Sequence, residues 1–423
     1  MSLKKHDRTY DLVLFGATGY TGTYTAEYIA QSLPINLKWA IAGRSQEKLA
    51  KIAAGIKESY PDRHQPDIEI CSNGLSELVE LAKKTFVLIT TVGPYGSYGE
   101  AAFKTCAENG THYVDVTGEV SFVAKMIRKY EATAKASGAL MFPQCGIESA
   151  PADIAAAEIA HINRTQLQAK TGEVTASIRI KALPSGGTLD TMLTAFERTS
   201  FSEMRACLAP YALSPVARPN GRRGSASLLS LLTGGQRVRH LGQLTTSMSG
   251  STNAAQVERT WGLLASMPGR SGETYGSNFS FKEYSRVRNW LEGIQVHWML
   301  VLALFLLATL PPFRWLAKRF VFAPGTGQTR EEASKNVIEY SAVGVPDIEG
   351  VSKPNKVAFS SATYRGSMYC LTGTLASEAA LAILKDDLGL NEGGIYTPSF
   401  LGRGFIERLG DAGFKFETKL IDA

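Results

Sequence analysis

The sequence predicts an α/β protein, with a doubly wound parallel sheet in its first part and a second, α+β domain after it. Three observations predict this fold class. Short apolar runs alternate with helical segments over the first 150 residues, a glycine-rich turn follows the first run, and the rhythm changes after Ile147. Strands that alternate with helices form right-handed βαβ units and hence a parallel sheet. A chain of 423 residues is also too long for one ordinary core.

Six strands are expected in the first part. Most are short, nearly continuous apolar runs, which are typical of strands buried on both faces of a parallel sheet. They are Tyr10–Phe15, Leu37–Ala42, Asp67–Cys71, Phe86–Val92, Thr111–Val116 and Gly138–Gln144. Helices are expected between them, over Thr23–Ser32, from Ser45 to about Ile56, and over Glu100–Asn109.

The second part has a less regular pattern. Residues 215–285 are rich in Gly, Ser and Arg with poor periodicity, and we expect long loops with short elements there. The other expected elements are an exposed antiparallel strand Val174–Leu183, a helix Leu189–Thr199, paired strands Val357–Ala362 and Gly366–Thr374, a helix Ser377–Leu384, and a final loop, helix and strand.

Composition narrows the class of protein. The net charge of +6 suits a phosphate-bearing cofactor or an anionic lipid surface. Nucleic acid is not an expected partner, because no zinc-ligand spacing, basic helix or aromatic-basic motif occurs. The five scattered cysteines indicate a reducing compartment and argue against a disulfide framework and against a metal site. The first eleven residues have no apolar core, so we expect no secretory signal and an intracellular, cytoplasmic protein.

The turn after the first expected strand has the spacing GxxGxxG. Its seven residues are Gly16, Ala17, Thr18, Gly19, Tyr20, Thr21 and Gly22. The first glycine permits the sharp turn, the second lets the backbone approach a pyrophosphate, and the third lets the following helix pack close to the sheet. The free N–H groups at the helix N-terminus then point at the phosphates. Between a strand and a helix, this turn predicts a Rossmann dinucleotide-binding domain, with all seven residues at the cofactor.

The end of the second strand favours NADP(H) over NAD(H). An acidic residue there would bind the ribose hydroxyls of NAD, whereas this chain has Arg44 and Ser45, with Lys48 one helical turn further on. A guanidinium can hold a 2′-phosphate with two hydrogen bonds, and a serine hydroxyl can add a donor. We expect all three residues to bind the cofactor. The alternative is a solvated arginine at the start of a helix.

The fourth strand ends where the cofactor crevice is expected. Its last residues, Val92, Gly93, Pro94 and Tyr95, are predicted to contact the cofactor. Gly93 would let the chain pass near the ribose or nicotinamide, and Pro94 would stiffen it. Tyr95 is expected either to stack or donate a proton, or to be a packed aromatic.

Six segments occur in a recognisable order: GATGYTG, AGRS, TTVGPYGSYGE, AENGTHYVDVTGE, QCGIESAPADIA and PSGGTLDTM. Together they closely resemble the saccharopine dehydrogenase-like oxidoreductases, which include the trans-acting enoyl reductases of glycolipid synthesis. The resemblance covers most of the chain apart from roughly residues 205–340. It implies a Rossmann domain over 1–150, an α+β substrate domain over 151–350, and a C-terminal part, 351–423, that returns to the Rossmann domain. It also implies NAD(P)H and, in the lipid branch, reduction of an acyl-linked double bond.

Reduction of a C=C bond requires a proton as well as the hydride that the cofactor supplies. Candidate catalytic residues are those at the expected carboxyl ends of strands, where open α/β sheets bind ligands. They are Tyr95, Asp115, Glu119 and Cys145, of which Cys145 is also expected to contact the cofactor, with Glu148 and Asp153 as further acids. Asp115, Glu119 and Asp153 have the alternative of helix capping, and Cys145 that of a small buried residue.

Ser185, Gly186, Gly187 and Thr188 form a turn with free N–H groups and two hydroxyls at the expected start of a helix. This turn is the predicted substrate-binding site, for a carboxylate, a carbonyl or a phosphate. An ordinary capping turn is the alternative.

The segment 296–313 is apolar all round and ends in a proline pair. It has three interpretations. The first is a buried helix or the wall of an apolar tunnel. The second is a monotopic anchor, with Arg314, Lys318 and Arg319 at lipid headgroups and Trp298 and Trp315 at the interface. The third is a transmembrane span, for which about 20 residues are needed.

The leading functional hypothesis is an NADP(H)-dependent reductase of a lipid-linked substrate. The alternatives are a non-catalytic NADP-binding redox sensor and a saccharopine-type imine reductase. The expected partners are a lipid-like small molecule, a membrane or lipid-droplet surface and a second copy in a homodimer. The resemblance places relatives at lipid droplets or mitochondrial membranes, and the same association is expected here.

Overall fold

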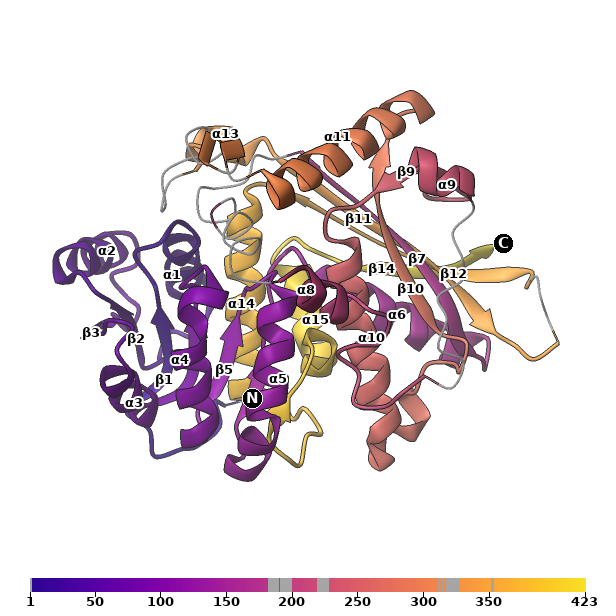
Figure 1. Ribbon diagram of the computed structural model, residues 1–423. Coiled ribbons are helices and arrows are strands. Elements are labelled where there is room, and N and C mark those ends of the chain that lie inside the picture. The colour runs from indigo at the N-terminus through magenta and orange to yellow at the C-terminus, as the bar shows by residue number, and fades with distance from the viewer. Residues whose placement is uncertain are drawn as a thin grey trace.

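Two seven-stranded sheets organise the molecule, with helices between them (Figure 1). The computed structural model describes residues 2–181, 190, 200–218, 228–310, 312–313, 315–316, 327–350 and 354–423. One apolar core runs from the first sheet through helices α14 and α6 to the second sheet. The predicted fold class is confirmed: a doubly wound parallel sheet with a second, mixed-sheet domain.

The first sheet is parallel throughout, as the apolar runs predict. In spatial order its strands are β13 (Gly394–Ile395), β6 (Leu140–Phe142), β5 (His112–Asp115), β4 (Thr85–Thr90), β1 (Tyr10–Phe15), β2 (Trp39–Gly43) and β3 (Asp67–Ile70). The order reverses between β1 and β4, which is the place where such sheets open a ligand crevice at the strands' carboxyl ends.

Helices cover both faces of this sheet. On one face lie α1 (Tyr20–Ser32), α2 (Gln46–Ser59) and α14 (Met368–Lys385), and on the other α3 (Leu75–Lys84), α4 (Tyr95–Asn109) and α5 (Val120–Ser137). In α14 the close contact with α1 depends on Gly373, because a Cβ there would lie 3.0 Å from the Cα of Thr25.

The second sheet is mixed. In spatial order its strands are β14 (Glu417–Asp422), β12 (Lys356–Arg365), β11 (Val337–Asp347), β7 (Lys170–Lys181), β10 (Ser280–Val287), β9 (Gly242–Thr246) and β8 (Gln236–Val238). The remaining helices are α6 (Ala150–Gln166), α8 (Phe201–Cys207), α9 (Leu228–Thr233), α10 (Gly250–Ser266), α11 (Trp290–Thr309), α13 (Arg330–Ser334) and α15 (Gly402–Asp411), with 3₁₀ turns at Pro268–Glu273 and Pro398–Leu401.

Three sequence-based expectations in this part are wrong. The strand expected at Val174–Leu183 is not exposed: β7 lies at the centre of the second sheet, parallel to β10 and antiparallel to β11. Residues 215–285 are not mainly loops, since α10 alone has twelve buried residues. The strand expected at Gly366–Thr374 is instead the start of α14, which Ser367 caps by accepting from the N–H of Tyr369. The helix expected at Leu189–Thr199 lies outside the described residues, apart from Asp190.

The C-terminal part is shared between the two sheets rather than returning to the first alone. β13 adds a strand to the parallel sheet and α14 covers one of its faces, whereas β12 and β14 complete the second sheet. The predicted boundary at residue 351 therefore does not separate two structural domains.

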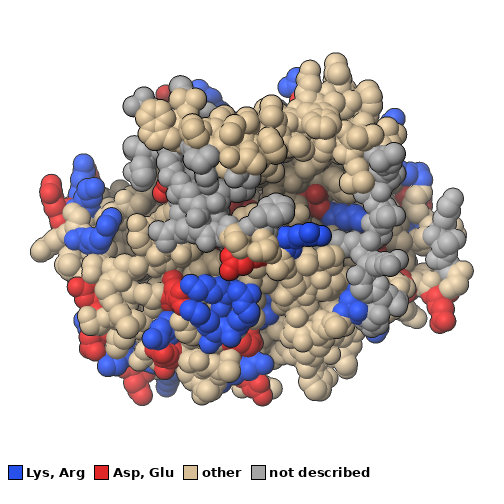
Figure 2. Space-filling view, in the orientation of Figure 1, with Lys and Arg blue, Asp and Glu red and all other residues tan. Residues whose placement is uncertain are grey.

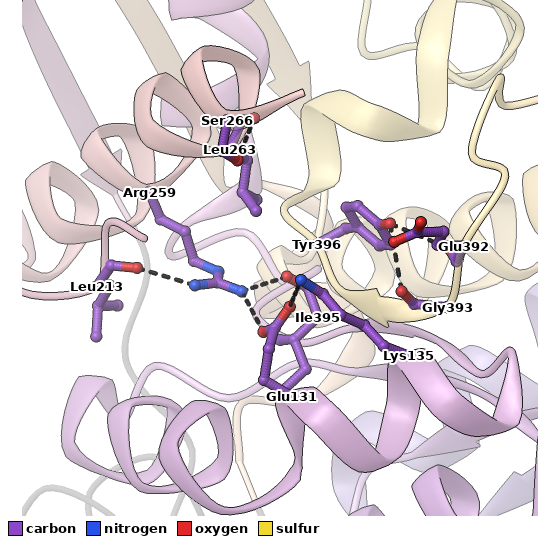
Figure 3. A network of polar contacts seen from close by, with 10 residues as sticks. All are labelled: Glu131, Lys135, Leu213, Arg259, Leu263, Ser266, Glu392, Gly393, Ile395 and Tyr396. Carbon is purple, nitrogen blue, oxygen red and sulfur yellow. Dashed lines mark hydrogen bonds and ion pairs between the residues drawn. The ribbon is translucent and has the colours of Figure 1, made fainter. Parts of the chain in front are cut away.

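A buried arginine on α10 joins the two parts (Figure 3). The Arg259 guanidinium is 3% exposed and forms an ion pair with Glu131 of α5 at 2.8 Å. It also donates to the carbonyls of Leu213, at 2.9 Å, and of Ile395 in β13. Lys135, one turn along α5, lies 3.8 Å from the same carboxylate. One side chain thus connects the second domain to a helix and a strand of the first.

α11 is not buried, contrary to one interpretation of the apolar segment. It has 20 residues, begins before the apolar run at Trp290, and has only 6% of its Trp290–Leu307 window buried. Arg314, Lys318 and Arg319 lie outside the described residues.

Candidate active site

The turn between β1 and α1 has the geometry of a phosphate loop. Gly16 has φ +94° and donates its N–H to the Ala42 carbonyl at 2.9 Å, which directs the chain away from the sheet. Gly22 packs directly on this turn, because a Cβ there would collide with the Gly16 carbonyl and lie 2.9 Å from the Cα of Ala17. The N-terminus of α1 is therefore held against the turn, and its first N–H groups face outward for an anion.

Thr91, which the sequence analysis did not single out, holds this loop against the end of β4, with Val92 beside it. The Thr91 hydroxyl donates to the Gly16 carbonyl at 3.1 Å, and its N–H donates to the Phe15 carbonyl at 2.9 Å. A Cβ on Gly16 would come within 2.8 Å of both Thr91 Oγ1 and the Val92 side chain. Val92 was expected at the cofactor, and it does lie beside the loop. A threonine after an apolar strand carries no distinctive signal, so only the structure shows the role of Thr91.

The residues expected at the cofactor 2′-phosphate lie together after β2. Arg44 is exposed at the end of the strand, and Ser45 caps α2, its Oγ accepting the N–H of Lys48 at 3.3 Å. The Ser45 hydroxyl still has its own hydrogen to donate. An exposed guanidinium beside a helix N-terminus gives this edge positive charge.

Tyr95 is bonded within the fold. It is the first residue of α4 and is 5% exposed. Its phenol donates to the Thr90 carbonyl at 2.8 Å and accepts from the N–H of Val116 at 3.4 Å. Burial raises the pKa of the phenol well above its usual range. The alternative of a packed aromatic fits these contacts better than a proton donor, since the hydroxyl bridges β4 and the chain after β5.

Glu119 holds the start of α4. One carboxylate oxygen accepts the N–H of Tyr95 at 2.6 Å, and the other accepts the N–H of Gly96 at 2.9 Å. Gly96 leaves the room for this contact, because a Cβ there would lie 2.8 Å from Glu119 Oε2. The carboxylate therefore caps α4, on the other side of the sheet edge. The sequence-based alternative was that it caps the helix that follows it, α5.

Asp115 and Cys145 are buried at the ends of β5 and β6. The Asp115 carboxylate accepts from the N–H groups of Thr117 and Gln144 and from the Tyr113 hydroxyl, at 3.0, 2.9 and 2.8 Å. Burial nevertheless raises the pKa of Asp115 to about 6. Burial also raises the pKa of the Cys145 thiol, which lies 3.4 Å from the Phe142 carbonyl. Both residues link the two strands, and Cys145 fits the alternative of a small buried residue.

Glu148 differs from the other acids in this region. It is half-buried, and within the described part of the chain it has no hydrogen-bond or ion-pair partner. Its carboxylate lies over Gly118, where a Cβ would collide with Oε2. Burial, with the negative charge of Glu119 as a second cause, raises the pKa of Glu148. Its carboxyl group is therefore protonated at higher pH than a free one and is not committed to another contact.

The other predicted residues lie elsewhere or outside the structure. Asp153 is buried in α6, where it accepts from the Thr260 hydroxyl and, at 2.8 Å, from the N–H of Ser399. The turn of Ser185, Gly186, Gly187 and Thr188 lies outside the described residues. Among the residues that the structure describes, no group of three or more His, Cys, Asp or Glu side chains could hold a metal ion.

These residues fit a dinucleotide phosphate. The cradle at Gly16 and Gly22 is one that a Cβ would fill, and Arg44 supplies positive charge at the next strand. The family profile of the saccharopine dehydrogenase NADP binding domain matches residues 12–141. The chain therefore contains the NADP-binding domain of the saccharopine dehydrogenase family. The expectations of an oxidoreductase and of NADP(H) as its cofactor are thereby confirmed.

Relatives of this family match nearly the whole chain. A Mycobacterium tuberculosis protein, named as a candidate trans-acting enoyl reductase, is 29% identical and covers 97% of this chain and 98% of its own. A saccharopine dehydrogenase-like oxidoreductase from Bos taurus is 27% identical, with 97% of each chain covered. A Caenorhabditis elegans protein named as lipid droplet localized is 38% identical over 34% of this chain and 35% of its own.

One solved structure has the same fold over nearly its full length. It is apo saccharopine dehydrogenase (L-Glu forming) from Saccharomyces cerevisiae, with a TM-score of 0.53 and 13% sequence identity. The match covers 97% of this chain and 99% of the yeast chain. At this identity the likeness shows a shared fold of two sheets, and nothing about the substrate.

Proposed function

We propose that this chain is an NADPH-dependent reductase that reduces a C=C bond beside the carbonyl of a lipid-linked substrate. The observation that carries the proposal is the position of its exposed apolar helix. Figure 1 shows α11 and α13 along the same upper side of the molecule. Residues 327–330, at the start of α13, contact the phosphate loop and α1: the Tyr20 hydroxyl donates to the Gln328 carbonyl at 2.7 Å, and Arg330 pairs with Glu27 of α1. An apolar surface and the cofactor loop are thus structurally connected.

The names of the relatives support the same substrate class. A protein that resembles this chain over 97% of its length is named for enoyl reduction, and one that matches 34% of it is named for lipid droplets. A small, multiply charged imine substrate would not require an exposed apolar helix, so the imine reductase is the weaker alternative.

The bound cofactor supplies a hydride, and the protein must supply a proton. Tyr95, Asp115 and Glu119 are each engaged in hydrogen bonds within the fold. Glu148 is the carboxyl group at this edge that retains free donor capacity. We assign it the role of proton donor, because burial, and secondly the negative charge of Glu119, raise its pKa. Gly118 makes room for this arrangement.

The first test is titration of the full chain with NADPH and NADH. Replacing Arg44 with Ala removes one charge-assisted phosphate contact, so NADPH should bind more weakly by about 1.5–3 kcal/mol, which is more than tenfold, while NADH binding stays nearly unchanged. Lys57→Ala is the matched control, because it removes an exposed charge from the other end of α2. Equal affinity of the Arg44→Ala and wild-type proteins for NADPH would contradict this part of the proposal.

The second test concerns the substrate. NADPH oxidation is measured with a long-chain 2-enoyl thioester and, separately, with an imine formed from an amino acid and an aldehyde. Turnover of the enoyl compound alone supports the proposal, and turnover of the imine alone refutes it. Tight NADPH binding with no oxidation in either assay would favour the alternative of a redox sensor.

A further inference from the structure

The exposed surface of α11 is apolar to an unusual degree. Among the described residues, α11 is the one helix long and apolar enough to cross a membrane, with a mean hydropathy of 1.7 over Trp290–Leu307. From Gly293 to Leu310 the sequence has no Asp, Glu, Lys or Arg. Trp298, Leu302 and Phe305 are more than half exposed, at 51%, 56% and 60%. Their spacing of four and three residues places them on one side of the helix.

Helix α9 extends this surface. It packs against α11, and its Leu229, Leu231 and Leu232 are 66%, 62% and 54% exposed. Figure 2 shows a ridge along the top of the molecule on which uncharged residues predominate, while Lys, Arg, Asp and Glu gather below it. We call these six exposed side chains of α9 and α11 the apolar platform. A contiguous apolar patch of this kind marks an interaction site in a soluble protein.

The first half of α11 is fixed to the second sheet. The Thr245 hydroxyl of β9 donates to the Gly293 carbonyl at 2.7 Å, and Thr246 Oγ1 lies 2.7 Å from His297 Nδ1. Gly293 and His297 are the buried positions of the described helix. A helix held along its side by a sheet cannot leave that sheet to cross a bilayer without breaking these bonds. This argues for a helix that lies along a surface.

We propose that the apolar platform enters the outer leaflet of a phospholipid surface, with the axis of α11 lying in the plane of that surface. At 1.5 Å per residue the helix is about 30 Å long. An in-plane helix buries its apolar side to about 5–10 Å, at the boundary of headgroups and acyl chains. Interfaces with a protein partner usually have a polar rim that contributes to specificity, and from Gly293 to Leu310 this helix has no charged residue to form one.

Positive charge just before α11 is consistent with a phospholipid surface as the partner. Arg286 and Arg288 are exposed just before α11, where they can reach phosphate groups while the platform is inserted. Trp298 has an amphipathic ring of the type found at the membrane interface. The inference deepens the proposed function, since a reductase docked on lipid receives an apolar substrate without passage through water. It depends on that function only for the identity of the substrate.

Flotation of the purified full chain with phosphatidylcholine vesicles tests the proposal. We expect the wild-type protein to float with the vesicles, and Leu302→Asp and Phe305→Asp each to weaken binding about tenfold or more. Ile35→Asp is the matched control: Ile35 is 65% exposed on the far domain, after α1, and its replacement should leave flotation unchanged. NADPH titration of the same variants should give wild-type affinity, which separates this test from that of the proposed function.

Three outcomes would overturn the proposal. The first is a wild-type chain that stays with the soluble fraction. The second is flotation that Leu302→Asp and Phe305→Asp leave unchanged. The third is a dimer that these variants convert to monomers without any vesicle binding, which would make the platform a contact between two copies.

Fluorescence quenching measures how deeply α11 enters the lipid. The part of the wild-type signal that Trp298→Phe removes should be quenched more strongly by lipids brominated near the headgroup than by lipids brominated near the chain end. The reverse order would exclude an in-plane helix.

Discussion

Replacing Gly22 with Ala tests whether the packing of α1 on the phosphate loop determines both stability and cofactor binding. The new Cβ would collide with the Gly16 carbonyl and lie 2.9 Å from the Cα of Ala17, whereas ordinary contacts begin at 3.4 Å. Both obstacles are backbone, so α1 must move outward by about half an ångström or more. α14 restricts this movement, because Gly373 packs closely against Thr25, one turn further along α1.

The magnitude follows from overpacking, which costs about 1–3 kcal/mol in a close-packed interior. Gly55→Ala is the matched control: Gly55 lies inside the adjacent helix α2, and a Cβ there would meet nothing within 4 Å. That substitution should stabilise the protein by about 0.5–1 kcal/mol, because alanine restricts the unfolded chain and favours a helix. Gly22→Ala should lower the free energy of unfolding and Gly55→Ala should raise it, so the two variants should differ in this free energy by about 1.5–4 kcal/mol.

Chemical denaturation and NADPH titration of both variants provide the assay. Gly22→Ala should also bind NADPH at least about tenfold more weakly, because the N-terminus of α1 moves away from the phosphates. Gly55→Ala should bind it as the wild type does. If Gly22→Ala proved as stable as Gly55→Ala and bound NADPH normally, the reasoning from the close approach at Gly16 would be refuted.

Two further predictions concern buried charges. Since the pKa of Glu148 is raised, kcat/KM should fall as pH rises through that pKa, because the donor loses its proton. Glu148→Gln should abolish this fall of kcat/KM with pH and lower kcat by about 100-fold or more. An unchanged pH profile would exclude Glu148 as the donor. Arg259→Met should lower the free energy of unfolding by about 3–5 kcal/mol, because it leaves two buried carbonyls without a donor and Glu131 without its buried partner. Lys135→Met removes only the exposed partner of the same carboxylate and should cost at most about 1 kcal/mol in the same denaturation assay.

The first domain could be predicted from the sequence because its signals are local. Most of its strands are short apolar runs, for which the periodicity of hydrophobic residues is sufficient, whereas the bounds of α3 and α5 and the two-residue strand β13 were not predicted. The glycine loop also has a local signature. The positions of β1, α1 and β2 agree with the prediction to within a few residues.

The second domain could not be predicted in the same way, because its buried elements contain polar residues. Helix α10 is buried on all sides, yet it includes Asn253, Gln256 and Arg259. Their partners come from distant segments, as when Asn253 donates to Glu283 of β10 at 2.8 Å. Such a helix lacks an apolar stripe, and a reading based on periodicity takes it for a loop.

The start of α14 was mistaken for a strand for a related reason. Gly373 and the β-branched Thr372 and Thr374 weaken the helical signal, and the favourable packing of α14 on α1 is visible only in three dimensions. In the active site, sequence reasoning found the acids that lie at the strand ends. It could not tell Glu119, which caps α4, from Glu148, which remains free, because that difference depends on contacts across the sheet edge.

The arrangement of the last 70 or so residues has a consequence for how the protein is made. β13 and β14 are the edge strands of different sheets, and both come from the final 30 residues of the chain. Neither sheet is complete until β13 and β14 have been synthesised, and the apolar face that α14 covers remains open to the solvent until residues 368–385 are present. A fragment that ends at residue 150 would lack β13 and α14, and we expect it to aggregate. We therefore expect the Rossmann domain of this chain to fold only together with the C-terminal segment that supplies β13 and α14.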